Sequence, residues 1–168
     1  QFCLVERTLP ECPFYGTSRE DPTAIWSIRT DPGTGGVVEE KVKDITADES
    51  DSNYPNGLAF DTENEIWYFA EKGGILNTMN EDGCLGIKTY EGISGGADIA
   101  GAAFYEGGYF FTPQNGDTLY KVTLEGDTVN KEVVCSDLPL SSHTFGDIAI
   151  DENGIAYFSV NGALFTVD

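Results

Sequence analysis

The sequence repeats itself, and the period of the repeat restricts the fold more than any other feature. A small apolar segment, a polar turn, an aromatic segment and a further apolar segment follow one another three times between Asn56 and Asp168. Aligned on Ala59, Ala103 and Ala149, the copies are spaced by 44 and 46 residues. Self-similarity at a period of about 20–50 residues is typical of arrays of one supersecondary unit. We therefore expect a fold built from repeated units of one kind.

Each copy divides into four short segments with strand character. In the first copy they are Leu58–Phe60, Ile66–Phe69, Ile75–Leu76 and the more polar stretch 84–90. Short apolar runs between Gly, Asn and Asp turns are typical of antiparallel strands, and no stretch has the length and period of an amphipathic helix. Four antiparallel strands in about 40–50 residues predict an all-β fold of the β-propeller type. The aromatic second segments are expected to be core.

The predicted strands group into a single β-propeller-like domain over residues 1–168. Its blade-like repeats cover residues 1–45, 56–92, 98–138 and 144–168. The first and last repeats supply about three strands each, which gives about three and a half four-stranded blades, fewer than most closed propellers have. The sequence therefore predicts a partial propeller, or one that is completed between molecules. A piece of a longer, closed propeller is the alternative.

The charge of the chain is strongly negative, with 9 Lys and Arg against 29 Asp and Glu and a formal net charge of −20. Binding to nucleic acid needs a basic face, so this composition argues against it. It also argues against anionic membrane surfaces, and no apolar run of about 18 residues predicts membrane insertion. We expect a solvated acidic surface, with binding of cations or of a basic partner as the alternative. Gln1 is expected to be a processed terminus.

Four cysteines, Cys3, Cys12, Cys84 and Cys135, indicate an oxidising, extracellular compartment. The chain has one His and no C-x-x-C pair, which argues against structural zinc. An even number of cysteines in such a chain favours disulfides. We predict Cys3–Cys12, which closes a proline-rich segment, and Cys84–Cys135, which joins equivalent positions of neighbouring repeats. Buried free thiols are the alternative.

An acidic loop supplies weak candidates for a calcium site. Asp48, Asp51 and Asn53 carry oxygen ligands of the kind that Ca²⁺ takes. The loop lacks the full spacing of a known calcium loop and the bidentate Glu at its end. A solvated loop is the simpler expectation, and no cofactor is assigned.

The single His is a candidate base for catalysis. His143 follows Ser141 and Ser142 just before a first strand, where propellers place ligand loops. A His can serve as base to a Ser, but no orienting acid accompanies the pair at a recognisable spacing. A capping or surface His is therefore expected, and no residue is assigned as catalytic.

Two sequence patterns carry a resemblance to known propellers. Pro55–Asp61 and Gly146–Asp151 resemble the first-strand words of the NHL-repeat and regucalcin/gluconolactonase-like propellers. The opening pattern, with Phe2–Val5 and Ala24–Ile28, resembles an uncharacterised class of secreted propellers. The resemblance covers most of the chain as a repeat pattern, and it implies architecture more specifically than function.

The gluconolactonase-like resemblance implies a divalent cation at the channel mouth, held by a Glu near the N-terminus and by Asn or Asp residues before the first strands. Asn56 matches such a position, but the equivalents Ala100 and Gly146 have no ligating side chain. Asp147 is displaced by one residue, which turns a strand side chain to the other face. Glu6 lies near the start but lacks the family's Gly-Pro continuation. The implied ligand set is therefore broken.

The function that the sequence favours is a secreted, non-enzymatic structural or interaction protein. The last repeat lacks an outer strand, and residues 1–8 form a short apolar segment with no hairpin partner. Unpaired strand edges are templates for pairing with another chain, and a head-to-tail contact that does not close makes a filament. We therefore expect self-association through strand edges, as a subunit of an extracellular filament or matrix. The alternatives are a divalent-cation-dependent lactonase or hydrolase of the gluconolactonase-like class, and a sugar-binding propeller.

Overall fold

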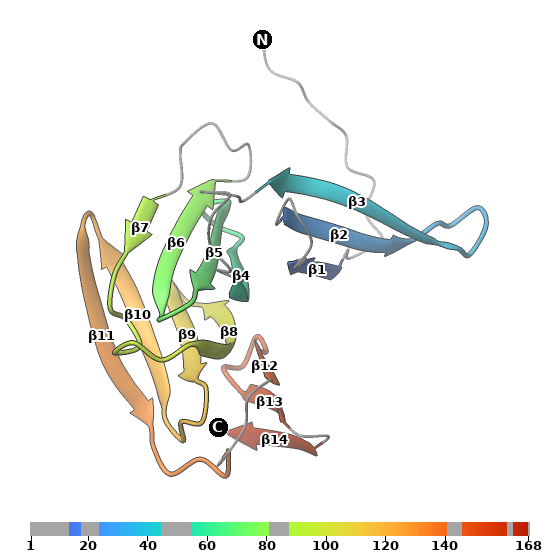
Figure 1. Ribbon diagram of the computed structural model, residues 1–168. Coiled ribbons are helices and arrows are strands. Elements are labelled where there is room, and N and C mark those ends of the chain that lie inside the picture. Colours follow the sequence, from blue (N-terminus) through green and yellow to red (C-terminus); the bar gives the residue numbers. More distant parts are fainter. Residues whose placement is uncertain are drawn as a thin grey trace. The chain divides into compact units, whose positions relative to one another are not determined.

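The computed structural model of this chain describes residues 14–17, 24–44, 55–80, 88–140, 146–160 and 163–167. Fourteen strands in four antiparallel sheets make up the regular structure of these residues (Figure 1). The predicted all-β class is therefore confirmed. A search of the same residues finds no helix long and apolar enough to cross a membrane. The chain divides into two compact units, Gln1–Ser50 and Asp51–Asp168.

The first unit contains one sheet of three described strands. Their order is β1 (Phe14–Thr17), β2 (Ala24–Thr30) and β3 (Val37–Asp44). The Asp31 carboxylate shapes the turn between β2 and β3, because it accepts hydrogen bonds from the Gly33 N–H and the Thr34 hydroxyl, both at 2.8 Å. The repeat over residues 1–45 was expected to supply about three strands, and β2 covers its apolar segment Ala24–Ile28.

Strand β1 was not predicted, because Pro and Gly in its neighbourhood favour irregular structure. It nevertheless pairs with β2 over four residues, and Gly16 lies opposite Trp26. A Cβ at Gly16 would have no atom within 4 Å, so this glycine is tolerated in a short edge strand without being required by packing.

The second unit contains three sheets, each a meander of consecutive strands. The first sheet is formed by β4 (Asn56–Asp61), β5 (Ile66–Glu71), β6 (Ile75–Asn80) and β7 (Lys88–Tyr90). The second is formed by β8 (Ile99–Tyr105), β9 (Gly108–Pro113), β10 (Leu119–Glu125) and β11 (Thr128–Cys135). The third is formed by β12 (Gly146–Ile150), β13 (Ala156–Val160) and β14 (Ala163–Val167). These sheets coincide with the repeats of the sequence.

The repeated acidic residue at the end of the first strand caps the turn that follows. Asp61 accepts hydrogen bonds from the N–H groups of Glu63 and Asn64 at 3.0 and 3.2 Å. Asp151 accepts from the N–H groups of Asn153 and Ile155 at 2.9 and 3.0 Å. Such bonds stabilise tight turns, so the repeated acidic residue determines the local structure of the turn.

The central sheet, β8–β11, lies between the other two sheets and is buried on both faces. Tyr109 and Phe111 point into a cluster shared with the β4–β7 sheet. Phe110 and Leu119 point into a second cluster shared with the β12–β14 sheet. The alternation of strand side chains between faces produces this division. The prediction that the aromatic second strands form the core is confirmed for β5 and β9 and for Phe158 of β13, whereas Tyr157 of β13 is half-buried.

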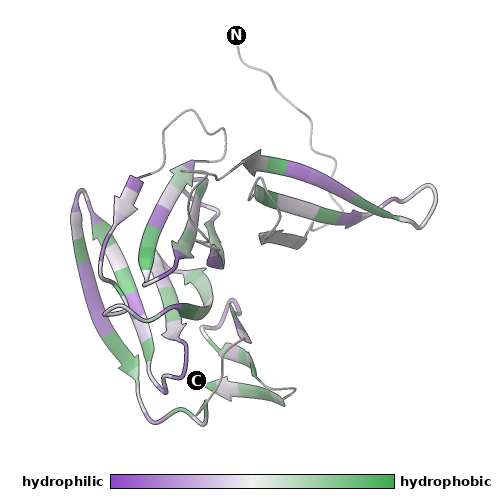
Figure 2. Cartoon of the chain, in the orientation of Figure 1, coloured by the Kyte–Doolittle hydropathy of each residue, from purple (hydrophilic) through white to green (hydrophobic). Residues whose placement is uncertain are grey.

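The outer strands are polar and form the rim of the sheets. Figure 2 shows the hydrophilic middle of β11, which is exposed over most of its length. At this rim the Lys88 ammonium of β7 contacts an Asp127 carboxylate oxygen at 2.7 Å and donates to the Gly126 carbonyl at 2.8 Å. The Tyr90 hydroxyl donates to the same carbonyl at 3.2 Å. These contacts fasten β7 to the β10–β11 turn.

Candidate functional site

The first strands of the three sheets begin at one place in the second unit. Strand β4 contacts β8, and β8 contacts β12, so Asn56, Ile99 and Gly146 begin neighbouring strands. In this region the Asn56 amide Nδ2 donates to the carbonyls of Ile99 at 2.7 Å and Ala100 at 3.2 Å. The residue that resembles a metal ligand therefore joins the first two sheets.

A buried tyrosine makes a second connection between the same two sheets. The Tyr109 hydroxyl of β9 donates to the Gly57 carbonyl of β4 at 2.7 Å, with Tyr109 fully buried. Gly57 has φ of 59°, and a Cβ there would lie 2.7 Å from the Tyr109 oxygen. Only glycine fits this combination of positive φ and close approach. Burial, and then the charge of Asp147, raise the pKa of Tyr109, so this hydroxyl is a hydrogen-bond donor at neutral pH.

The central and third sheets meet backbone to backbone. A Cβ on Gly101 of β8 would lie 2.7 Å from the Cα of Asp147 on β12. The Asp147 carboxylate accepts a hydrogen bond from the Ile148 N–H at 2.9 Å. Although the residue is exposed, crowding by neighbouring atoms desolvates the carboxyl and raises its pKa, and the Ile148 bond partly offsets this. Gly146 and Asp147 take opposite faces of β12, as successive strand residues do.

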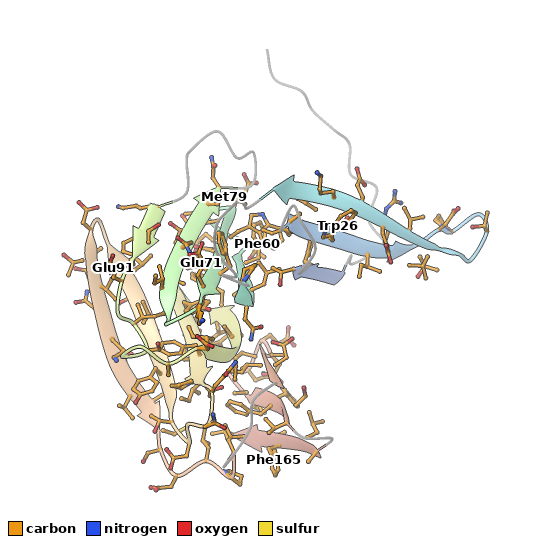
Figure 3. All side chains as sticks on the ribbon, in the orientation of Figure 1. Trp26, Phe60, Glu71, Met79, Glu91 and Phe165 are labelled. Carbon is orange, nitrogen blue, oxygen red and sulfur yellow. The ribbon has the colours of Figure 1, made fainter. Side chains whose placement is uncertain are left out.

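The loop before β8 is fixed to the turn between β5 and β6. The Asp98 carboxylate accepts a hydrogen bond from the Gly73 N–H at 2.7 Å, and the Ser94 hydroxyl donates to the Ala97 carbonyl. A side chain at Gly74 would overlap Ser94. Glu71, labelled in Figure 3, ends β5 beside this turn, and burial raises the pKa of its carboxyl. Polar groups here therefore hold loops together.

The described residues do not assemble a metal site. No three His, Cys, Asp or Glu side chains among them lie close enough to hold one ion. Two sets of candidates fall outside the described residues and remain predictions. One set comprises Asp48, Asp51 and Asn53 of the acidic loop, together with Glu6 of the gluconolactonase-like ligand set. The other comprises the serines Ser141 and Ser142 with His143.

The disulfide predicted between Cys84 and Cys135 is absent, because Cys135 carries a free thiol. Cys135 ends β11 and packs against the cluster between the central and third sheets. Desolvation raises the pKa of the Cys135 thiol. Cys3, Cys12 and Cys84 lie outside the described residues.

Of the side chains that join the sheets, sequence reasoning singled out Asn56 but not Tyr109. Tyr109 precedes Phe110 and Phe111 in an aromatic strand. Its hydroxyl, which these two residues lack, was the sequence feature that could have indicated its hydrogen bond. Two buried polar atoms were also missed: Nε1 of Trp26 and Nδ2 of Asn77 have no hydrogen-bond partner in the described part of the chain. Asn77 accepts a hydrogen bond from the Thr89 hydroxyl through Oδ1, at 2.7 Å.

No family model and no curated protein matches the sequence. Among solved structures, the chain is similar to a protein of unknown function from Bacteroides thetaiotaomicron, with a TM-score of 0.66 and 17% identity. It is also similar to the extracellular domain of a proposed one-component system from B. thetaiotaomicron, with a TM-score of 0.53 and 19% identity. The matches cover 93% and 91% of this chain, but only 42% and 21% of the two neighbours. At these identities the likeness concerns the fold alone.

Proposed function

We propose that this chain is a non-enzymatic interaction module, secreted from the cell and built as a propeller-type stack of sheets. One observation carries the proposal: the polar side chains at the converging strand starts are bound to backbone groups of other segments. Asn56 is bound to the carbonyls of Ile99 and Ala100, and Tyr109 to that of Gly57. Side chains used in this way stabilise the scaffold.

The propeller-type description is supported by the arrangement of the sheets. The sheets are meanders, and the first strands of the second unit's three sheets lie next to one another, as strands around a propeller axis do. A fold neighbour that is an extracellular domain supports secretion. The number of blades in the complete protein is left to experiment.

The proposed partners are proteins, including further copies of this chain, and the product is an extracellular filament or matrix. Among the described residues, β14 has no strand paired to its outer edge, where β7 and β11 complete the other two sheets. Such an edge accepts a further strand by backbone pairing. The edge of β11 is a poorer acceptor, because it carries Lys131, Glu132 and a bulge near Cys135.

The gluconolactonase-like alternative has less support. A hard cation needs several converging oxygens. The Asn56 nitrogen is engaged with two carbonyls, which leaves its Oδ1 as the only atom for an ion, and Ala100 and Gly146 supply no side-chain ligand.

Calorimetric titration with CaCl₂ and with MgCl₂, together with lactone hydrolysis assays, tests the proposal. We expect no saturable heat and no hydrolysis above buffer, and we expect calcium to change the melting temperature no more than NaCl of matched ionic strength does. Saturable binding together with hydrolysis that EDTA abolishes would contradict it. The double variant Asp48→Asn, Asp51→Asn is the control that separates a calcium site in the acidic loop from one at Asn56.

A further inference from the structure

The three repeats of the second unit present one equivalent face each, and the third of these faces is uncovered. Ala59 and Ala103 lie opposite Tyr68 and Phe110 across the first two strands of their sheets. Each of these two faces packs against the following sheet. Ala149 and Tyr157 form the equivalent pair in the β12–β14 sheet, where Ala149 is exposed and Tyr157 half-buried.

We call this uncovered surface the open face. It consists of one side of all three strands, namely Asp147, Ala149, Tyr157, Ser159, Leu164 and Thr166. Leu164 is 68% exposed. Its neighbour Phe165, labelled in Figure 3, takes the opposite face of β14 and packs into the cluster against the central sheet. The open face is therefore the side of the sheet that its counterparts in the other repeats use for packing.

The first unit presents the complementary kind of face. Hairpin β2–β3 corresponds to hairpin β10–β11, because each consists of the last two strands of its sheet in chain order. Both hairpins have a register shift near the start of their first strand, between Ile25 and Trp26 in β2 and between Leu119 and Tyr120 in β10. In β10 the Tyr120 side packs against the cluster shared with the preceding sheet. The Trp26 side of β2–β3 is therefore equivalent to the side by which β10–β11 packs on its preceding sheet.

We call this second surface the hairpin face. It consists of Trp26, Ile28, Thr30, Val37, Glu39 and Lys41. Ile28 is 38% exposed and Val37 is 71% exposed. Large exposed apolar side chains gathered on one sheet face indicate an interaction surface.

We infer that the open face of one molecule docks on the hairpin face of a second copy of this chain. The contact would repeat the packing already present twice within the second unit, where the side that carries Phe110 or Tyr68 receives the following sheet. The inference rests on the proposed function, since it assigns a surface to the self-association proposed there. It makes assembly depend on a face-to-face contact, without which the edge of β14 is not expected to hold two molecules together.

Charge decides between this head-to-tail contact and a contact between two open faces. The first unit, Gln1–Ser50, has 5 Lys and Arg against 10 Asp and Glu, and the second, Asp51–Asp168, has 4 against 19. Two open faces would bring two strongly acidic units together. The head-to-tail contact pairs the strongly acidic unit with a less acidic one, and it pairs the open face, which carries Asp147, with the hairpin face, on which the charges of Glu39 and Lys41 cancel. A contact between two different surfaces adds molecules in a row unless a ring closes.

Sedimentation velocity over a concentration series, at physiological or higher salt to screen the net charge, tests the inference. We expect concentration-dependent oligomers of the unaltered chain. Leu164→Glu on the open face and Val37→Glu on the hairpin face should each sediment as a monomer of 18.2 kDa. A mixture of the two variants should form a dimer and no larger species, because each variant keeps one intact face. Val133→Glu is the matched control, since Val133 is 60% exposed on β11 and belongs to neither face.

Each other outcome overturns a defined part of the inference. An unaltered chain that stays monomeric at the highest concentration overturns it entirely. Association that survives both variants, with circular dichroism showing them folded, overturns the assignment of the faces and leaves edge pairing. Monomeric variants whose mixture forms no dimer overturn the head-to-tail geometry. The metal titration and lactone assays report separately on the proposed function.

Discussion

The central and third sheets of the second unit derive from the same repeat, yet their surroundings differ. In β9, Phe110 and Phe111 point to opposite faces and are both buried. In β13, Phe158 is buried while the adjacent Tyr157 is half-buried. The difference arises because, among the described residues of the second unit, sheets pack on both sides of β8–β11 but on one side of β12–β14. Equal sequence patterns therefore contribute unequally to stability, since burial depends on the neighbour that each face receives.

The largest contrast is expected from truncation of one apolar side chain in each sheet. Phe111→Ala opens a cavity in a fully buried position and should lower the free energy of unfolding by about 3–5 kcal/mol. Leu164→Ala removes an exposed side chain, so in dilute solution it should change that free energy by less than about 0.5 kcal/mol. Urea denaturation followed by circular dichroism measures both. Similar losses from the two variants would mean that the third sheet is as well covered as the second.

A smaller effect is expected where the central and third sheets touch. Gly101→Ala places a methyl group 2.7 Å from the Asp147 Cα, and it should destabilise the protein by about 1–3 kcal/mol because overpacking forces the backbone to shift. Gly16→Ala is the control, since a Cβ there has no atom within 4 Å. Thermal melts of the two variants test this, and a Gly101→Ala protein as stable as the control would contradict the close approach of β8 and β12.

The hydroxyl groups of Tyr109 and Tyr157 give a third comparison. Tyr109→Phe removes the hydrogen bond that the tyrosine hydroxyl donates to the buried Gly57 carbonyl, and leaving a buried acceptor unpaired costs about 1–3 kcal/mol. Tyr157→Phe removes a 3.2 Å hydrogen bond to Asp151 at a partly exposed site, where water replaces the partner. Chemical denaturation should therefore show a larger loss for Tyr109→Phe. An equal loss would place the two hydroxyls in similar surroundings.

The smallest effect concerns the pH dependence of two carboxyl groups in the third sheet. Hydrogen bonds, led by that from the Ile155 N–H, lower the pKa of Asp151 below 3.8. Its contribution to stability is therefore present above pH 3.8 and is lost as the pH falls through the folded-state pKa. Desolvation raises the pKa of Asp147 above 3.8, so ionisation of Asp147 opposes folding as the pH rises through that value.

Opposite signs are thus expected for two matched variants at pH 7. Asp151→Asn should lower stability, and Asp147→Asn should leave it unchanged or raise it slightly. The effect of Asp147→Asn should disappear at about pH 3, where the carboxyl is protonated in both states. Denaturation at the two pH values measures this, and carboxyl ¹³C titration by NMR checks the direction of each pKa shift. A titration midpoint that places the Asp147 pKa below 3.8 would reverse the expectation.

Much of the fold followed from the sequence because the repeat word contains local signals. Apolar alternation located strands such as β5 and β13, and the acidic residues Asp61 and Asp151 located the turns that they cap. Strand β1 was missed because Gly16 and the neighbouring prolines give no local strand signal, and the pairing with β2 decides the outcome. The Cys84–Cys135 disulfide predicted from sequence equivalence is not formed, because Cys135 carries a free thiol, and equivalence in a repeat does not by itself bring two side chains together.

The candidate site shows the same division. The sequence identified Asn56 and Asp147 as the polar residues at the starts of first strands, since both belong to the repeat word. It did not reveal that the Asn56 amide binds two carbonyls of β8, or that Gly101 brings β8 against Asp147. Such contacts join residues more than forty positions apart, and no local pattern encodes them.

The sequence by itself determined the all-β class, the repeat boundaries and the capped turns, because strand alternation and turn chemistry act within a few residues. Only the tertiary structure decided that the central sheet is covered twice and the third sheet once, that Cys135 stays a free thiol, and that Tyr109 joins two sheets. These properties depend on which face packs against which neighbour, and burial of that kind is a property of the assembled sheets.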